Sequence, residues 1–206
     1  MKKIIISIVT ILLVFCFPAQ CDTQEYDFSD LTIEELSTLI DKAQAQLRFM
    51  QVKAAGLPDA EYMAMLSNLP AVVTEARCMI QSEEYKSVYP DYLQAIIVNN
   101  SEDDIQDVVV AFAAWDENGL PVKIRGQYDF GNVDYIKEVS FSEVNAVPGA
   151  TFGDNKGYKL SASCNIATVR AIVVSYTGLN YKTWKNPYYE SFAAKYRGRK
   201  LADVIG

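Results

Sequence analysis

The stretch from residue 92 to residue 176 constrains the fold most, because short apolar segments alternate there with turn residues. The segments are rich in Val, Ile, Ala and aromatic residues, which favour β-strands. Strands are predicted over residues 92–99, 105–116, 122–128, 135–141, 158–162 and 169–176. Alternation over residues 72–81 predicts one more, although a third helix would also fit. Parallel strands would need helical crossovers, so the pattern predicts an antiparallel β-sandwich.

Two helices are predicted ahead of these strands. Thr32 and Glu35 form a capping box, which marks a helix start. Apolar residues then recur at spacings of three and four, at Ile33, Leu36, Ile40, Ala43, Leu47 and Met50. This narrow stripe either packs on the rest of the molecule or pairs with another chain as a short coiled coil. Gly56-Leu57-Pro58 ends the helix, and Asp59 can cap a shorter second one that runs to about Asn68.

The N-terminus has the features of a cleavable secretory signal. Two lysines follow Met1, residues 4–17 are almost entirely apolar, and Ala19-Gln20-Cys21 places small residues at a cleavage site. The apolar run is short for a permanent membrane anchor, which is the alternative. Residues 1–21 are therefore expected to be removed, so that an exported chain begins near Asp22.

The four cysteines carry information about processing. One lies inside the expected signal. Cys21 is either removed with it or is the lipid-modified cysteine of a lipoprotein, although Pro18 and Gln20 fit that motif poorly. Cys78 and Cys164 remain, and they form either a disulfide in an oxidising compartment or two buried free thiols.

The chain contains no histidine. Ser-His-Asp and Cys-His catalysis, and zinc held by histidine, are therefore excluded. Removal of residues 1–21 would lower the basic count from 19 to 17 against 26 acids and leave a net charge of −9. So acidic a chain is not expected to bind nucleic acid.

The expected organisation has three parts. Residues 1–21 are a signal peptide, residues 22–70 a linker and helical segment, and residues 71–206 a β-sandwich domain. A short amphipathic helix from Tyr188 to about Leu201 ends this domain. The mature chain is long enough for one substantial domain with a smaller element.

Residues 182–200 combine basic and aromatic side chains. Six cations stand there against one acid, giving a net charge of +5. Such a set can bind an anionic polymer or a sugar face through charge and ring stacking. The candidate ligand surface consists of Trp184, Lys185, Tyr188, Tyr189, Lys195, Arg197 and Arg199. The alternative is that the rings complete the core while the cations are solvated.

Acidic residues raise two further hypotheses. Glu102, Asp103 and Asp104 would share one end of a meander with Asp129 and Asp134, where carboxylates could gather around Ca²⁺. No segment has a calcium-loop pattern, and solvated turn residues explain these acids as well. Two carboxylates could also hydrolyse a glycan without histidine, but nothing marks a converging pair. No catalytic residue, metal or cofactor is therefore assigned.

Several motifs resemble those of one protein family. They are Tyr89-Pro90-Asp91-Tyr92-Leu93-Gln94, Val98-Asn99-Asn100-Ser101, Ala114–Ile124, Val173-Val174-Ser175-Tyr176 and Trp184–Tyr189. In this order they resemble a family of domains of unknown function found in exported proteins and lipoproteins of Gram-positive bacteria. The resemblance covers about Ser82 to Leu201 and implies an immunoglobulin-like fold, a bacterial source and an exported location. Asp30–Gln46 resembles a helical segment that precedes envelope-associated domains in such bacteria. The resemblance implies no activity.

Together these features predict a non-catalytic interaction module of the bacterial cell envelope that binds an envelope protein or an anionic wall polymer. It would be secreted or attached to the outer face of the membrane, with membrane contact only through a lipid at Cys21. One alternative is a structural spacer or assembly subunit that pairs through its N-terminal helix. Another is a carboxylate-dependent glycan hydrolase. The sequence does not define the oligomeric state.

Overall fold

The computed structural model describes residues 31–86, 88–131, 133–161 and 164–205. The predicted signal peptide and Cys21 lie outside these residues. By its contacts the chain divides into two units, Met1–Lys53 and Ala54–Gly206. Within the described part, no helix combines the length and the apolar character needed to cross a membrane.

In the first unit the described residues belong to helix α2 (Ile33–Ala55). The predicted capping box is confirmed: Thr32 N donates to Glu35 Oε2 at 2.8 Å, and Glu35 N donates to Thr32 Oγ1 at 3.2 Å. Most of the predicted apolar stripe is half-buried. Ile33, Phe49 and Val52 are exposed, by 89%, 65% and 75%. The helix therefore presents large apolar side chains to solvent.

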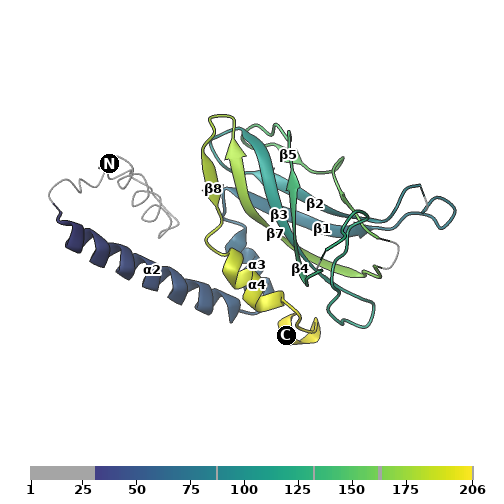
Figure 1. The fold of residues 1–206 in the computed structure, drawn as a ribbon, viewed down its shortest axis with the longest axis horizontal. Coiled ribbons are helices and arrows are strands. Elements are labelled where there is room, and N and C mark those ends of the chain that lie inside the picture. Colours follow the sequence, from purple (N-terminus) through teal and green to yellow (C-terminus); the bar gives the residue numbers. More distant parts are fainter. Residues whose placement is uncertain (1–30, 87, 132, 162–163, 206) are drawn as a thin grey trace. The chain divides into compact units, whose positions relative to one another are not determined.

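The second unit contains two antiparallel sheets (Figure 1). In the first sheet, β1 (Ala71–Met79) pairs with β2 (Tyr92–Asn99), and β2 also pairs with β5 (Thr151–Phe152) and β6 (Tyr158–Lys159). The second sheet has the order β4 (Ile136–Phe141), β3 (Ile105–Trp115), β7 (Thr168–Gly178) and β8 (Thr183–Lys185). The prediction of a mainly antiparallel β structure is confirmed, and the first predicted strand is β1 rather than a helix.

One predicted strand is wrong. Residues 122–128 make only isolated bridges, between Ile124 and Asp134 on one side and between Gly126 and Leu160 on the other. Ile124 is fully buried, because the segment covers part of the core. The segment therefore contains apolar residues although it joins no continuous ladder. Its apolar pattern therefore imitates a strand. The short strands β5 and β8 were not predicted, because two or three residues carry too little periodicity.

Two hydrophobic cores lie on opposite faces of the second sheet. The first core combines residues of both sheets, including Leu93, Ile97, Val110 and Phe112. The second core lies between the other face of the second sheet and three helices, α3 (Asp59–Leu66), α4 (Tyr189–Tyr196) and α5 (Ala202–Ile205). Strand β3 is therefore buried on both faces, which explains why residues 108–115 are continuously apolar.

Helices α3 and α4 are joined to the second sheet by buried polar contacts. Asp59, which is 6% exposed, accepts hydrogen bonds from Arg170 Nη2 at 2.9 Å and Nε at 3.2 Å. The Tyr196 hydroxyl donates to the same carboxylate. Lys195 Nζ donates to Leu57 O at 2.6 Å. By these contacts α3 belongs with the sheets, although the sequence analysis grouped residues 22–70 as one helical segment.

Replacement of Asp59 by alanine should lower the free energy of unfolding by about 3 kcal/mol, because the half-buried guanidinium of Arg170 and the buried phenol hydroxyl of Tyr196 would lose their acceptor. Urea unfolding of Asp59→Ala and wild type measures this difference. The matched control is Glu117→Ala at an exposed turn, which should change stability by less than about 0.5 kcal/mol. A cost for Asp59→Ala as small as that of the control would contradict the structural role of this ion pair.

Candidate functional site

The structure does not bring the predicted ligand surface of residues 184–199 to one open face. Lys195 is 4% exposed and its ammonium lies 5.7 Å from the ring centres of both Tyr62 and Tyr196, so this side chain does not lie on an open face, and the ligand surface stays a prediction. Basic and aromatic residues alternate here because α4 is amphipathic and docks on the second core, where Lys195 bonds to a buried carbonyl.

The remaining members of that surface have mixed positions. Lys185, Arg197 and Arg199 are exposed, whereas Trp184, Tyr188 and Tyr189 are half-buried. Trp184 stacks on Tyr176 with ring centres 5.3 Å apart. Arg197 pairs with the Asp134 carboxylate, and the Tyr189 hydroxyl donates to Glu138. The cations and rings are therefore largely engaged within the domain.

Two open cavities lie at another part of the domain, where the β1–β2 connection extends beyond the strands (Figure 1). Cys78 pairs with Leu93, and Met79 pairs with Tyr92. Because side chains alternate along a strand, Cys78 faces the first core together with Leu93, while Tyr92 faces the opposite side. The two cavities therefore lie on opposite sides of the first sheet, and Pro90 is the residue that lines both of them.

We call the outer one the tyrosine cleft. It has a volume of about 310 Å³ and is lined by Gln81, Tyr89, Pro90, Tyr92, Asp154, Asn155, Lys156, Gly157 and Lys159. Tyr89 is 62% exposed. The side chains of Gln81, Asp154 and Asn155 make no hydrogen bond to another described residue, so their amide and carboxylate groups are available to a ligand. Lys156 Nζ, by contrast, donates to Ser142 O at 2.7 Å.

The loop that carries Asp154 and Asn155 is held closely against β2. The buried Gln94 side chain donates from Nε2 to Asp154 O at 2.6 Å and accepts from Arg77 Nε at 2.8 Å. Gly153 has a φ of +105°, and a Cβ there would lie 2.1 Å from Ala95 O, so this position requires glycine. The cleft is therefore formed by a fixed loop rather than by a loose one.

The inner cavity, which we call the thiol cavity, has a volume of about 320 Å³. It is lined by Cys78, Ile80, Lys86, Pro90, Asp91, Leu160, Ser161, Cys164, Asn165 and Ile166. Burial, together with the nearby Asp91 and Cys164, raises the pKa of Cys78 to about 11. At neutral pH Cys78 is therefore a protonated thiol and a weak nucleophile.

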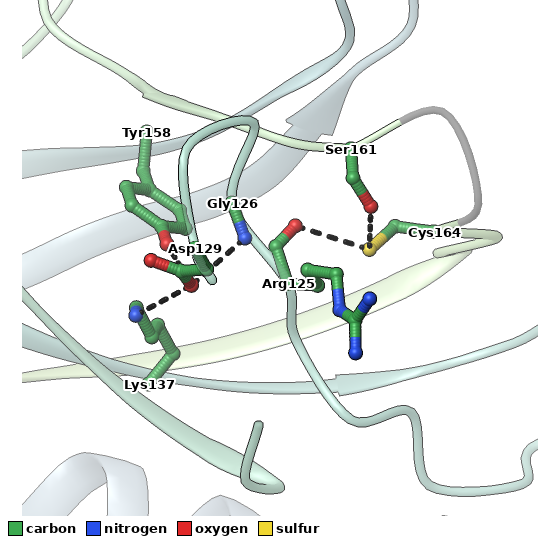
Figure 2. A network of polar contacts seen from close by, with 7 residues as sticks. All are labelled: Arg125, Gly126, Asp129, Lys137, Tyr158, Ser161 and Cys164. Atoms are coloured by element: carbon green, nitrogen blue, oxygen red, sulfur yellow. Dashed lines mark hydrogen bonds and ion pairs between the residues drawn. The ribbon is translucent and has the colours of Figure 1, made fainter. Parts of the chain in front are cut away.

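Cys78 and Cys164, for which the sequence left a disulfide and two free thiols open, are free thiols that line this cavity. Cys164 Sγ lies 3.3 Å from Arg125 O, to which it donates, and 3.7 Å from Ser161 Oγ (Figure 2). Among the described residues, no three His, Cys, Asp or Glu side chains gather as metal ligands.

A polar network supports the wall beside the thiol cavity (Figure 2). Asp129 Oδ2 accepts hydrogen bonds from Tyr158 Oη at 2.6 Å, Lys137 Nζ at 2.7 Å and Gly126 N at 3.0 Å. These bonds lower the pKa of Asp129 to about 2, and the bond from Lys137 has the largest effect. A Cβ on Gly126 would lie 2.0 Å from the Tyr158 hydroxyl oxygen. Asp129, which the sequence analysis considered for Ca²⁺, thus binds a side-chain cation.

The sequence analysis missed the tyrosine cleft. It treated residues 153–157 as a connecting loop and Tyr89-Pro90-Asp91 as a turn. The available signal was the loop itself, in which two glycines flank an acid, an amide and a cation between β5 and β6, the second of which begins with Tyr158. Only the register of β2 with β6 shows that Tyr92 and Lys159 are neighbours.

Comparison with known proteins gives a family but no activity. Residues 92–199 match the model of a family of unknown function, DUF5780. The chain belongs to this family. The match confirms the predicted membership of a family of unknown function, and it includes β2, β6 and Cys164. Comparison with curated proteins finds no match.

One solved structure is similar in fold to this DUF5780 member. It is a hypothetical protein from Peptoclostridium difficile 630, determined by X-ray diffraction at 1.85 Å. The two share 12% sequence identity and a TM-score of 0.54, over 67% of this chain and 99% of that protein. At this identity the similarity concerns the fold alone.

The Asp129 network predicts an acid-dependent contribution to stability. Because the folded pKa of Asp129 is lowered, its contribution is complete above about pH 4 and is lost as the pH falls to about 2. Asp129→Asn should therefore be less stable than wild type by about 1–2 kcal/mol at pH 6, and the difference should shrink towards pH 2. Urea unfolding across this range measures it, with Glu117→Gln as the exposed control. A difference that does not vary with pH would contradict the assignment.

Proposed function

We propose that this DUF5780 chain is an exported, non-catalytic interaction module of the bacterial cell envelope whose ligand is a wall glycan, bound in the tyrosine cleft. The observation that carries the proposal is the composition of that cleft. The exposed ring of Tyr89 and the half-buried ring of Tyr92 lie there beside amide and carboxylate groups that no described residue engages. This combination suits a sugar, which has an apolar ring face and a rim of hydroxyls.

Location and fold class form part of the proposal. Residues 1–21 read as a signal peptide, and Cys21 is either removed or lipidated. The two antiparallel sheets that share the first core support an immunoglobulin-like sandwich. Such folds carry binding surfaces on the loops at their ends, and the cleft lies beside the β1–β2 loop.

The residues around the cleft favour binding over hydrolysis. Hydrolysis of a glycosidic bond generally uses two carboxyl groups that flank it. Of the described residues that line the cleft, Asp154 alone carries a carboxylate. With Lys156 and Lys159 the lining carries a net charge of only +1, so the cleft lacks the dense positive charge that an anionic polymer would favour. A neutral stretch of wall glycan is the ligand that these groups fit best.

Binding to purified cell walls tests this function. Tyr89→Ala should weaken binding of the full chain by about tenfold or more, because one stacking surface is lost, and Asp154→Ala should weaken it similarly. Tyr181→Ala is the matched control, because Tyr181 is 85% exposed and lies outside the cleft; it should bind like wild type. Co-sedimentation with insoluble peptidoglycan measures the affinity.

The same experiment distinguishes the other ligands. If binding disappears after anionic polymers are stripped from the walls, the ligand is the anionic polymer and the glycan proposal is wrong. Cleft variants that bind walls like wild type would also overturn it, as would wild type that binds no wall preparation. An envelope protein that cross-links to wild type and not to Tyr89→Ala would assign the cleft to a protein partner.

The exposed apolar residues of α2 support a second function, assembly through the helical segment. Phe49→Ser should then lower the concentration-dependent mass of the full chain in sedimentation experiments, because burial of Phe49 would drive the pairing. Leu179→Ser, at a position 50% exposed in the second unit, is the matched control. A monomeric mass at all concentrations for wild type would exclude this function.

A further inference from the structure

The thiol cavity joins two segments that are distant in sequence. Cys78 lies near the end of β1, and Cys164 follows β6. The strand register directs Cys78 to the inner side of the first sheet, and Cys164 lines the same cavity. Both side chains are half-buried. The cavity is therefore lined by two thiols, neither of which lines the tyrosine cleft.

We propose that Cys78 and Cys164 form a disulfide across the thiol cavity when the chain meets an oxidising protein or small-molecule disulfide. This inference is independent of the proposed glycan ligand. The cross-link would tie the end of β1 to the segment that begins at Cys164. Both of these segments line the cavity beside Pro90, which also borders the tyrosine cleft.

The reaction is two steps of thiol–disulfide exchange. In the first, the Cys164 thiolate attacks one sulfur of the oxidant, a mixed disulfide forms, and the other half of the oxidant leaves as a thiol. In the second, Cys78 loses its proton and attacks Cys164 Sγ, which releases the second half of the oxidant. The chain thereby loses two protons and two electrons, and one disulfide of the oxidant becomes two thiols.

The surroundings of the two sulfurs set this order. Burial raises the pKa of Cys78 to about 11, so its thiolate is scarce at neutral pH. Cys164 lies on a segment outside the strands, and its contact with Arg125 O is at an exposed position that an oxidant can reach. Cys164 is therefore the first thiol to react, and Cys78 is the one that resolves the mixed disulfide.

Intact-mass measurement after treatment with oxidised glutathione tests the proposal. The full chain, with free thiols at the start, is oxidised, unfolded and alkylated without reductant. Wild-type Cys78 and Cys164 should take up no alkyl group, and the chain should be two hydrogens lighter and monomeric. Cys78→Ser should retain one glutathionyl group on Cys164. Cys164→Ser should react more slowly, because the remaining thiol is the less reactive one.

Thermal unfolding provides the second measurement. Reduction should lower the melting temperature of oxidised wild type by roughly 5–10 °C, because the closed loop is long. It should leave the melting temperature of the double variant Cys78→Ser, Cys164→Ser unchanged. Alkylation of both wild-type positions after oxidation, a glutathionyl group retained on each, or a disulfide-linked dimer would overturn the proposal.

Discussion

The second sheet is covered on both of its faces, and the rest of the structure depends on this double burial. Even-numbered residues of β3, such as Val110 and Phe112, face the first core, while Ala111 and Trp115 face the helices. A strand in this position has almost no exposed side chain and must be apolar throughout. Charged residues between the second sheet and the helices are paired: Asp59 of α3 binds Arg170 of β7, because an unpaired buried charge there would be costly.

The first sheet has a different character, since one of its faces shares the first core while most side chains of its other face are half-buried or exposed. Its exposed positions can therefore carry polar and aromatic groups without a cost to the core. The cleft and the cavity are consequences of this asymmetry. Strand alternation places Tyr92 and Cys78 on opposite sides of the same sheet within a few residues of the chain. Two chemically distinct sites thus lie back to back.

Much of the fold could be predicted from local patterns, whereas the candidate site could not. The capping box at Thr32, the helix at Asp59 and the long strands follow from periodicity and turn residues. The burial of Lys195 could not be predicted, because an amphipathic basic helix has the same pattern on a ligand surface and over a core. The tyrosine cleft depends on cross-strand register, which no single segment encodes.

The outer edge of β2 has a consequence for solubility during folding. Two short ladders divide this edge, one with β5 at Ile97 and Val98 and one with β6 at Tyr92 and Leu93. Between these ladders Gly153 packs directly against Ala95 O, and the Gln94 side chain donates to Asp154 O of the loop that follows Gly153. An edge that is filled in this way offers no template for an incoming strand from another molecule. The loop that forms the cleft therefore also protects this edge of the first sheet from edge-to-edge aggregation.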